Sequence, residues 1–176
     1  FEVDGLTTAT TRTVTIPDRD LTIGPTLATD QSLSSGTSKN FTGIPAGTKR
    51  ITMMLIGAST NGSSLMLVQI GDSGGIENTA YSSFVADLAA SASGPTAGFG
   101  IVSAQAAVNF YTGRVVLELD EASANRWLYT SIIADGATIY IGTGYKDLSA
   151  VLDRVRLTMT NGTDAFDAGT VNILYE

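Results

Sequence analysis

The segment Gly71-Asp72-Ser73-Gly74-Gly75 places a serine between an aspartate and two glycines, a pattern that surrounds some catalytic serines. A nucleophilic serine needs a base that accepts its hydroxyl proton and an acid that orients this base. The chain contains no histidine, the usual base in that chemistry, and nothing in the sequence places a lysine beside Ser73. We therefore predict no catalytic residue and no enzymatic activity. We expect a glycine-rich turn in which the Asp72 side chain binds nearby backbone amides.

Two acidic clusters, Glu118-Leu119-Asp120-Glu121 and Asp164-Ala165-Phe166-Asp167, are further candidates for chemistry. A pair of carboxylates can hydrolyse a glycosidic bond, but their separation in space decides this and sequence spacing does not give it. Oxygen ligands on a loop, such as Asp164 and Asp167, also suit Ca²⁺. Their spacing does not match an EF-hand, and a solvated turn is the simpler interpretation. We predict no metal and no cofactor, with calcium at Asp164 and Asp167 as the open alternative.

Aromatic side chains are the candidates for ligand binding, because a flat apolar ring can cover one face of a sugar and a tyrosine adds a hydroxyl group. Trp127, Tyr129, Tyr140 and Tyr145 lie on or beside predicted strands that lead to loops. Core packing is the alternative role for each of them, above all for Tyr129 and Tyr140. We predict that a receptor is contacted by loops at one end of the fold, with Trp127 and Tyr145 as the leading residues.

The composition excludes several classes of protein. The chain has no cysteine, so neither disulfides nor thiolate metal sites stabilise it. Its net charge of -7 argues against nucleic-acid binding, which needs clustered lysine and arginine. No apolar run approaches the length of a membrane span. The low charged fraction of 15% suits a rigid extracellular or virion β-protein, and the start at Phe1 leads us to expect the C-terminal part of a longer protein.

The elements that must position these residues are predicted to be antiparallel strands joined by turns. Residues 49–57 and 65–70 are apolar runs separated by Asn61-Gly62, which predicts a central hairpin because a type I′ turn needs positive φ at both positions. Residues 152–160 alternate, with Val155, Leu157 and Met159 on one face, which predicts a half-buried strand.

Further strands are predicted at residues 115–119, 126–134, 138–141 and 169–176. The segment 81–105 allows two interpretations. Phe84, Leu88 and Ala92 have helical spacing, which favours one short helix, whereas its many small residues favour a loop with a strand at 99–102.

The N-terminal segment differs from the remainder of the chain. Residues 7–23 are threonine-rich, alternate apolar and polar residues, and have too few large side chains to form a core alone. We therefore divide the chain into a shaft-like linker, residues 1–24, and a head domain, residues 25–176. The predicted fold class is all-β, an antiparallel jelly-roll-like β-sandwich with a short N-terminal trimeric shaft segment.

Three motifs in the head resemble the small C-terminal β-domains of bacteriophage tail-fibre and tailspike proteins. They stand at residues 41–54, 69–77 and 152–176, and the threonine-rich segment resembles the linkers that join trimeric shafts to such heads. The resemblance implies a virion protein that forms a homotrimer and binds bacterial surface polysaccharide or lipopolysaccharide. Its other virion partners would be contacted through the N-terminal part. The alternative is a purely structural fibre, baseplate or capsid-decoration domain, which trimerises or docks without binding a receptor.

The expected trimer contacts are the linker, residues 12–23, and one apolar face of the predicted central hairpin, residues 51–56. Three weak sites on one rigid stalk would gain affinity through effective concentration, without strong individual contacts.

Overall fold

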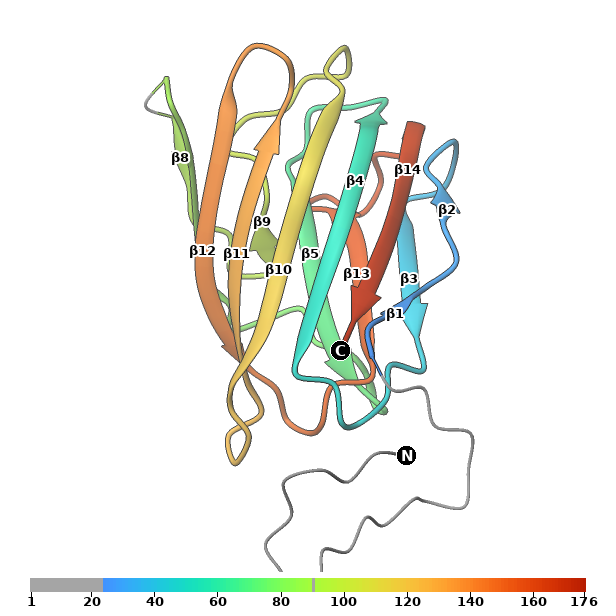
Figure 1. Cartoon of the computed structure of the whole chain (residues 1–176). Coiled ribbons are helices and arrows are strands. Elements are labelled where there is room, and N and C mark those ends of the chain that lie inside the picture. Colours follow the sequence, from blue (N-terminus) through green and yellow to red (C-terminus); the bar gives the residue numbers. More distant parts are fainter. Residues whose placement is uncertain (1–23, 90) are drawn as a thin grey trace, which may run out of the picture.

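The computed structural model describes residues 24–89 and 91–176, which form an all-β structure of two antiparallel sheets without a helix (Figure 1). Residues 1–23 of the predicted shaft-like linker, which include its expected trimer contacts at 12–23, lie outside the described residues. The strands are β1 (Thr26–Leu27), β2 (Gln31–Ser32), β3 (Ser38–Thr42), β4 (Arg50–Thr60), β5 (Met66–Asp72), β6 (Gly75–Ile76), β7 (Ser82–Asp87), β8 (Ala92–Ser93), β9 (Phe99–Gly100), β10 (Tyr111–Glu121), β11 (Arg126–Ala134), β12 (Ile139–Asp147), β13 (Arg154–Met159) and β14 (Phe166–Tyr175).

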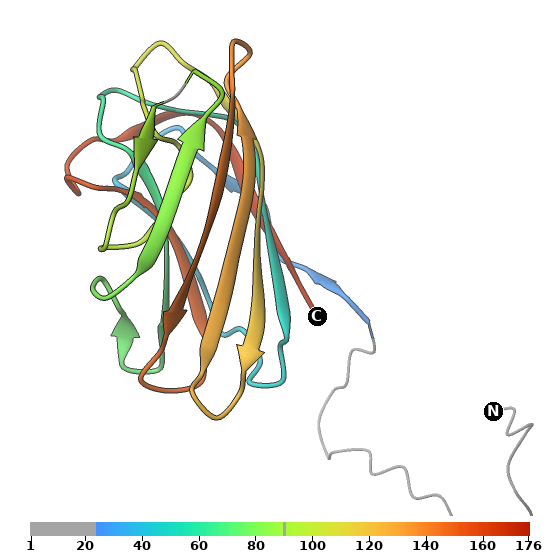
Figure 2. The same ribbon diagram turned by 90° about the vertical axis from the view of Figure 1, so that its left-hand side faces the viewer.

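The larger sheet has nine strands in the order β1-β14-β4-β10-β11-β12-β7-β8, with β2 also paired to β14. The smaller sheet has five strands in the order β3-β13-β5-β6, with β9 also paired to β5. Figure 2 shows the sheets as two layers, a sandwich-like arrangement that confirms the predicted all-β antiparallel class. Within residues 24–89 and 91–176 no helix is long and apolar enough to span a membrane.

The core forms between the inner faces of the sheets, because alternate residues of each long strand point inward. On β11 the side chains of Trp127, Tyr129 and Ile133 are buried, whereas Leu128 and Ile132 are exposed. Phe99 from the opposite sheet stacks on Tyr129, with ring centroids 4.6 Å apart. The strand periodicity thus directs one set of large side chains into the core and leaves a second set on the outer face.

The predicted central hairpin does not form. β4 belongs to the larger sheet and β5 to the smaller one, so Asn61-Gly62 connects two layers instead of two paired strands. Neither residue has the positive φ that a type I′ turn requires. Asn61 instead accepts a hydrogen bond from the Ala165 amide, and a Cβ at Gly62 would overlap the Asp164 carboxylate. Contacts with a distant turn therefore determine this connection.

The strand predicted at residues 152–160 is confirmed as β13, and Val155, Leu157 and Met159 are buried as expected. The strands predicted at 115–119, 126–134, 138–141 and 169–176 are confirmed within β10, β11, β12 and β14. The short helix around Phe84 and Leu88 is wrong, because this segment holds β7. The alternative prediction, a loop with a strand at 99–102, agrees better with the structure, because β9 begins at Phe99.

Candidate functional site

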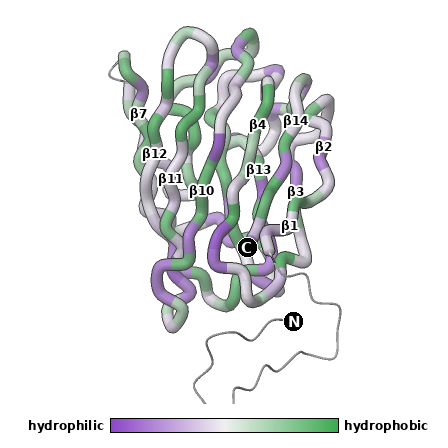
Figure 3. Tube along the Cα trace, in the orientation of Figure 1, coloured by the Kyte–Doolittle hydropathy of each residue, from purple (hydrophilic) through white to green (hydrophobic). Residues whose placement is uncertain are grey.

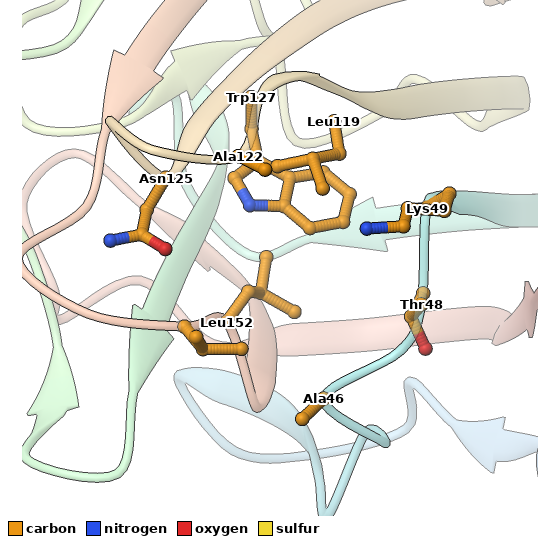
Figure 4. Close-up of a pocket in the computed structure, with 9 residues that line it drawn as sticks. Ala46, Thr48, Lys49, Leu119, Ala122, Asn125, Trp127 and Leu152 are labelled. Atoms are coloured by element: carbon orange, nitrogen blue, oxygen red, sulfur yellow. The ribbon is translucent and has the colours of Figure 1, made fainter.

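A small hollow opens at one end of the sandwich, where three connections meet (Figure 4). These connections are the β3–β4, β10–β11 and β12–β13 loops. The volume of the hollow is about 80 Å³, which is room for a few water molecules or a group of a few heavy atoms. The residues that line it are Ala46, Thr48, Lys49, Leu119, Ala122, Asn125, Trp127, Val151 and Leu152.

Trp127, the only tryptophan of the chain, forms one wall of the hollow. It pairs with Leu119 on β10 and Lys146 on β12, and its inward direction leaves it only 3% exposed. A buried indole N–H normally has a hydrogen-bond acceptor. No acceptor lies within reach of the Trp127 nitrogen in the described residues, and the nitrogen is open to solvent on the side of the ring that faces Asn125 (Figure 4). The hollow therefore contains a donor whose hydrogen-bonding capacity is unused.

Asn125 supplies a second polar group from the β10–β11 turn. Its φ is 48°, a left-handed conformation that asparagine tolerates better than most residues. Its backbone carbonyl accepts a hydrogen bond from the Leu148 amide at 3.2 Å, which ties the turn to the β12–β13 loop. Its carboxamide has no hydrogen-bond partner in the described part of the chain. In Figure 4 the carboxamide oxygen lies on the side of Trp127, whereas the amino group points away from it.

Lys49 supplies a cationic group opposite Asn125. Its backbone is held on both sides, since its amide donates to the Glu176 carbonyl at 2.7 Å and its carbonyl accepts from the Leu119 amide at 2.8 Å. In Figure 4 the ammonium group points toward the far edge of the Trp127 ring. No carboxylate of residues 24–89 and 91–176 lies within 4.0 Å of it. Val151 and Leu152 complete the hollow with apolar surface.

A polar network beneath the hollow fixes the β12–β13 loop. Lys146, buried on β12, forms an ion pair of 2.5 Å with Glu77, and the Ser149 amide donates to the other Glu77 oxygen at 2.7 Å. The Ser149 hydroxyl donates to Asp72 at 2.7 Å. Burial opposes ionisation of Glu77, but hydrogen bonds from Lys146 and Ser149 outweigh it and lower the pKa of Glu77. Hydrogen bonds from Ser149 and the Gly74 amide likewise lower the pKa of Asp72.

Tyr145 is the one exposed residue among the four predicted receptor-binding aromatics. It lies on the outer face of β12 and is 45% exposed. The Arg126 guanidinium lies 5.5 Å from the centre of its ring and also binds Asp147 through two hydrogen bonds of 2.7 and 3.3 Å. The hydrogen bond from Arg126 lowers the pKa of the Asp147 carboxyl. The structure thus does not bring Tyr145 into the hollow, but onto a neighbouring surface.

Tyr129 and Tyr140 lie in the core, the alternative role that the sequence allowed. The Tyr129 hydroxyl donates to the Gly100 carbonyl, and the Tyr140 hydroxyl donates to Asp135 at 3.0 Å. Burial raises the pKa of both phenols, so both remain neutral donors. Neither side chain offers a surface to a receptor in this conformation.

The sequence motifs that suggested catalysis or calcium hold turns together. The Gly74 amide donates to Asp72 at 2.7 Å, which confirms the predicted glycine-rich turn, and Ser73 is exposed. Asp164 accepts hydrogen bonds from the Asn161 carboxamide at 2.7 Å and the Ser64 amide at 2.9 Å. Asp167 lies on β14 and is exposed. In the part of the chain that the structure describes, no group of three or more acidic residues is placed to hold a metal ion.

No family model, curated protein or solved structure matches this chain. Of the residues at the hollow, sequence reasoning identified Trp127 and missed Asn125 and Lys49. Asn125 carries a usable signal, since an asparagine that closes a short turn between two strands often has positive φ. The sequence around Lys49 contains no comparable signal, because only the folded structure brings the residue before β4 beside the β10–β11 turn.

Proposed function

We propose that this chain is the receptor-binding β-sandwich of a virion appendage of the tail-fibre type, and that it binds a bacterial surface glycan at the Trp127 hollow. The observation that carries this proposal is the set of unused polar groups at Trp127, Asn125 and Lys49, which surround an aromatic and aliphatic surface. Unpaired polar groups next to a ring are suited to a sugar substituent, which combines apolar and hydrogen-bonding parts.

An acetamido group matches the hollow in size and chemistry. Its carbonyl oxygen accepts from the Trp127 indole N–H or the Lys49 ammonium, and its N–H donates to the Asn125 carbonyl oxygen. Its methyl group then packs on Leu152 and the aromatic ring. A bare hydroxyl group would leave the apolar wall and at least one donor unused, so we propose N-acetylated sugars as the ligand class.

Affinity at a hollow of this size is weak for one copy, and multivalency is the means by which weak sites hold a virion to a cell. The homotrimer implied by the resemblance to tail-fibre heads would present three hollows together. Polysaccharide and lipopolysaccharide both repeat their sugar units, which suits simultaneous occupation of several sites.

The single tryptophan makes this proposal directly testable, because its indole N–H gives one resonance that reports the hollow. Titration of the ¹⁵N-labelled chain with methyl N-acetylglucosaminide should shift this resonance saturably, whereas methyl glucoside should leave it in place. Asn125→Ala should weaken the response at least tenfold, which corresponds to about 1.4 kcal/mol for a lost polar contact.

Asn78→Ala is the matched control, since Asn78 is exposed and does not line the hollow. This variant should bind as the wild type does. If the indole N–H resonance does not shift with any of a panel of N-acetylated sugars while the protein remains folded, the proposed ligand class is refuted and the proposed function loses its main support.

The second candidate function is a structural virion domain that trimerises or docks without a receptor. The apolar outer face of the larger sheet favours it, because exposed Ile132 and Ile141 suit contact with another protein. Adsorption to host cells separates the two functions. A Trp127→Phe variant that melts normally but adsorbs poorly supports receptor binding, and unchanged adsorption supports the structural role.

A further inference from the structure

The outer face of the larger sheet carries a continuous band of large apolar side chains. An antiparallel sheet that covers a core on one side normally presents polar residues on the other. Here β7, β12 and β11 break that rule, with exposed fractions of 40–55% for side chains that include two aromatic rings and three isoleucines. These residues are Phe84, Leu128, Ile132, Ile139, Ile141 and Tyr145.

The strand register joins these side chains into one surface. Ile132 on β11 lies directly opposite Ile141 on β12, and Leu128 lies opposite Tyr145. Phe84 on β7 is paired with Thr143 on β12. Directly opposite residues on one face have their Cβ atoms about 4.5–5.5 Å apart, so the side chains touch across the strands. We call this surface the β7–β11 face.

The apolar area of this face lies in the upper part of the range found for the largest patch on a monomer. Six half-exposed large side chains present roughly 500 Å² of apolar surface, against about 300–600 Å² for the largest patch on a typical monomer. Flanking Thr130, Thr143 and Val116 extend the face toward the ~800 Å² that each partner contributes to a stable protein interface. A shallow depression of about 390 Å³ between Ile132, Ile141 and Arg50 gives the face a concave region into which side chains of a partner can pack.

Charge is absent from the middle of the β7–β11 face and present at its borders. The outward residues of β11 and β12 between the two ends are Leu128, Thr130, Ile132, Ile139, Ile141, Thr143 and Tyr145. Arg114 and Glu118 on β10 border it on one side, and Arg126 and Asp147 border it at one end. In Figure 3 the hydrophilic colours gather near the β10–β11 turn, whereas β11 and β12 above it are mostly white to green.

We infer that the β7–β11 face binds a second copy of this chain. The chain carries a net charge of -7, so two copies repel each other over most of their surface. The uncharged face is where they approach with the least repulsion and bury the most apolar area.

The sequence suggested another surface for subunit contacts, one apolar face of residues 51–56. Ile51, Met53 and Leu55 are buried inside the protomer, so they are unavailable to a partner. Outward-facing Ile56, which is 66% exposed, is separated from β11 by β10. The inference concerns self-association and does not depend on the proposed glycan site.

Sedimentation equilibrium of the full chain at micromolar concentration tests the inference. The wild type should have a mass that is a multiple of 18.3 kDa, and the double variant Ile132→Glu/Ile141→Lys should sediment as a monomer of 18.3 kDa. The two new charges lie opposite each other, so they pair within the monomer and preserve its fold. Val108→Glu is the matched control, because Val108 is 80% exposed on the β9–β10 loop and lies off this face.

A second measurement keeps the test decisive if the double variant misfolds. The chain has no cysteine, so Thr130→Cys introduces a single thiol at the middle of the face, and Thr163→Cys introduces one on an exposed turn. Alkylation of Cys at position 130 should slow at least tenfold as protein concentration rises, whereas alkylation at position 163 should not change. A monomeric wild type, or equal alkylation of both thiols at all concentrations, would overturn the inference. Titration with an N-acetylated sugar separates this outcome from failure of the proposed function.

Discussion

Replacement of Glu77 by glutamine should show how much the stability of the protein depends on the ion pair between Glu77 and Lys146. The Glu77 side chain is 23% exposed and that of Lys146 is 6% exposed. Glutamine has the same shape and can still accept the hydrogen bond from the Ser149 amide. The main change is therefore that the Lys146 ammonium loses its only carboxylate partner in the described part of the chain while it remains buried.

The size of the effect follows from what Lys146 retains. Removal of one partner from a fully buried pair costs about 3–5 kcal/mol, because a charge is left uncompensated. Lys146 keeps a hydrogen bond of 2.6 Å to the Asp147 carbonyl and lies 5.7 Å from the centre of the Tyr81 ring. Partial exposure of Glu77 weakens the original attraction further. We expect the free energy of unfolding to fall by about 2–3 kcal/mol.

Urea unfolding followed by the fluorescence of Trp127 measures this loss at a fixed protein concentration. The double variant Glu77→Gln/Lys146→Met should recover most of it, because an apolar residue of similar volume removes the uncompensated charge. A loss below about 0.5 kcal/mol in Glu77→Gln would show that Lys146 is solvated in solution, and would refute the described network.

The same pair predicts a dependence of stability on pH. The folded protein holds the pKa of Glu77 below its ordinary value of 4.5, so the stabilisation is fully present above pH 4.5 and is lost as the pH falls through the lower, folded value. Acid titration of the wild type should therefore show a loss of stability below pH 4.5, and this loss should be smaller in Glu77→Gln. An equal loss in both proteins would show that other carboxylates dominate.

Other substitutions test separate parts of the structure. Gly71→Ala should destabilise by about 3 kcal/mol or prevent folding, because a Cβ there would overlap the Gly75 carbonyl oxygen, and thermal unfolding measures this. Asp164→Ala should cost about 1–2 kcal/mol in urea unfolding, because the Ser64 amide loses its acceptor. Ser73 should remain unlabelled by a fluorophosphonate probe in intact-mass analysis. Stoichiometric labelling that disappears on unfolding would contradict the prediction of no catalysis.

Strand positions were the most predictable part of the fold, because they depend on local alternation. In β13 the period of two separates Val155, Leu157 and Met159 from the arginines without ambiguity, and the structure buries the same three residues. The helix expected around Phe84 and Leu88 failed for the opposite reason. Three residues at helical spacing, Phe84, Leu88 and Ala92, are too few to outweigh the pairing of β7 with β12.

Strand pairing was less predictable, because it depends on contacts far apart in the sequence. Asn61-Gly62 has the composition of a hairpin turn, yet Asp164 and Ala165, a hundred residues later, determine its conformation. The candidate site shows the same limit. Alternation along β11 and β12 places Tyr129 inside and Tyr145 outside, but only the complete sandwich brings Lys49 and Asn125 to Trp127.

The two proposed surfaces are compatible because they open in different directions. The β7–β11 face lies on the broad side of the larger sheet, whereas the loops that contribute residues to the hollow lie at the end of this sheet (Figure 1). A glycan at Trp127 and a second copy on the β7–β11 face would therefore not compete for the same residues.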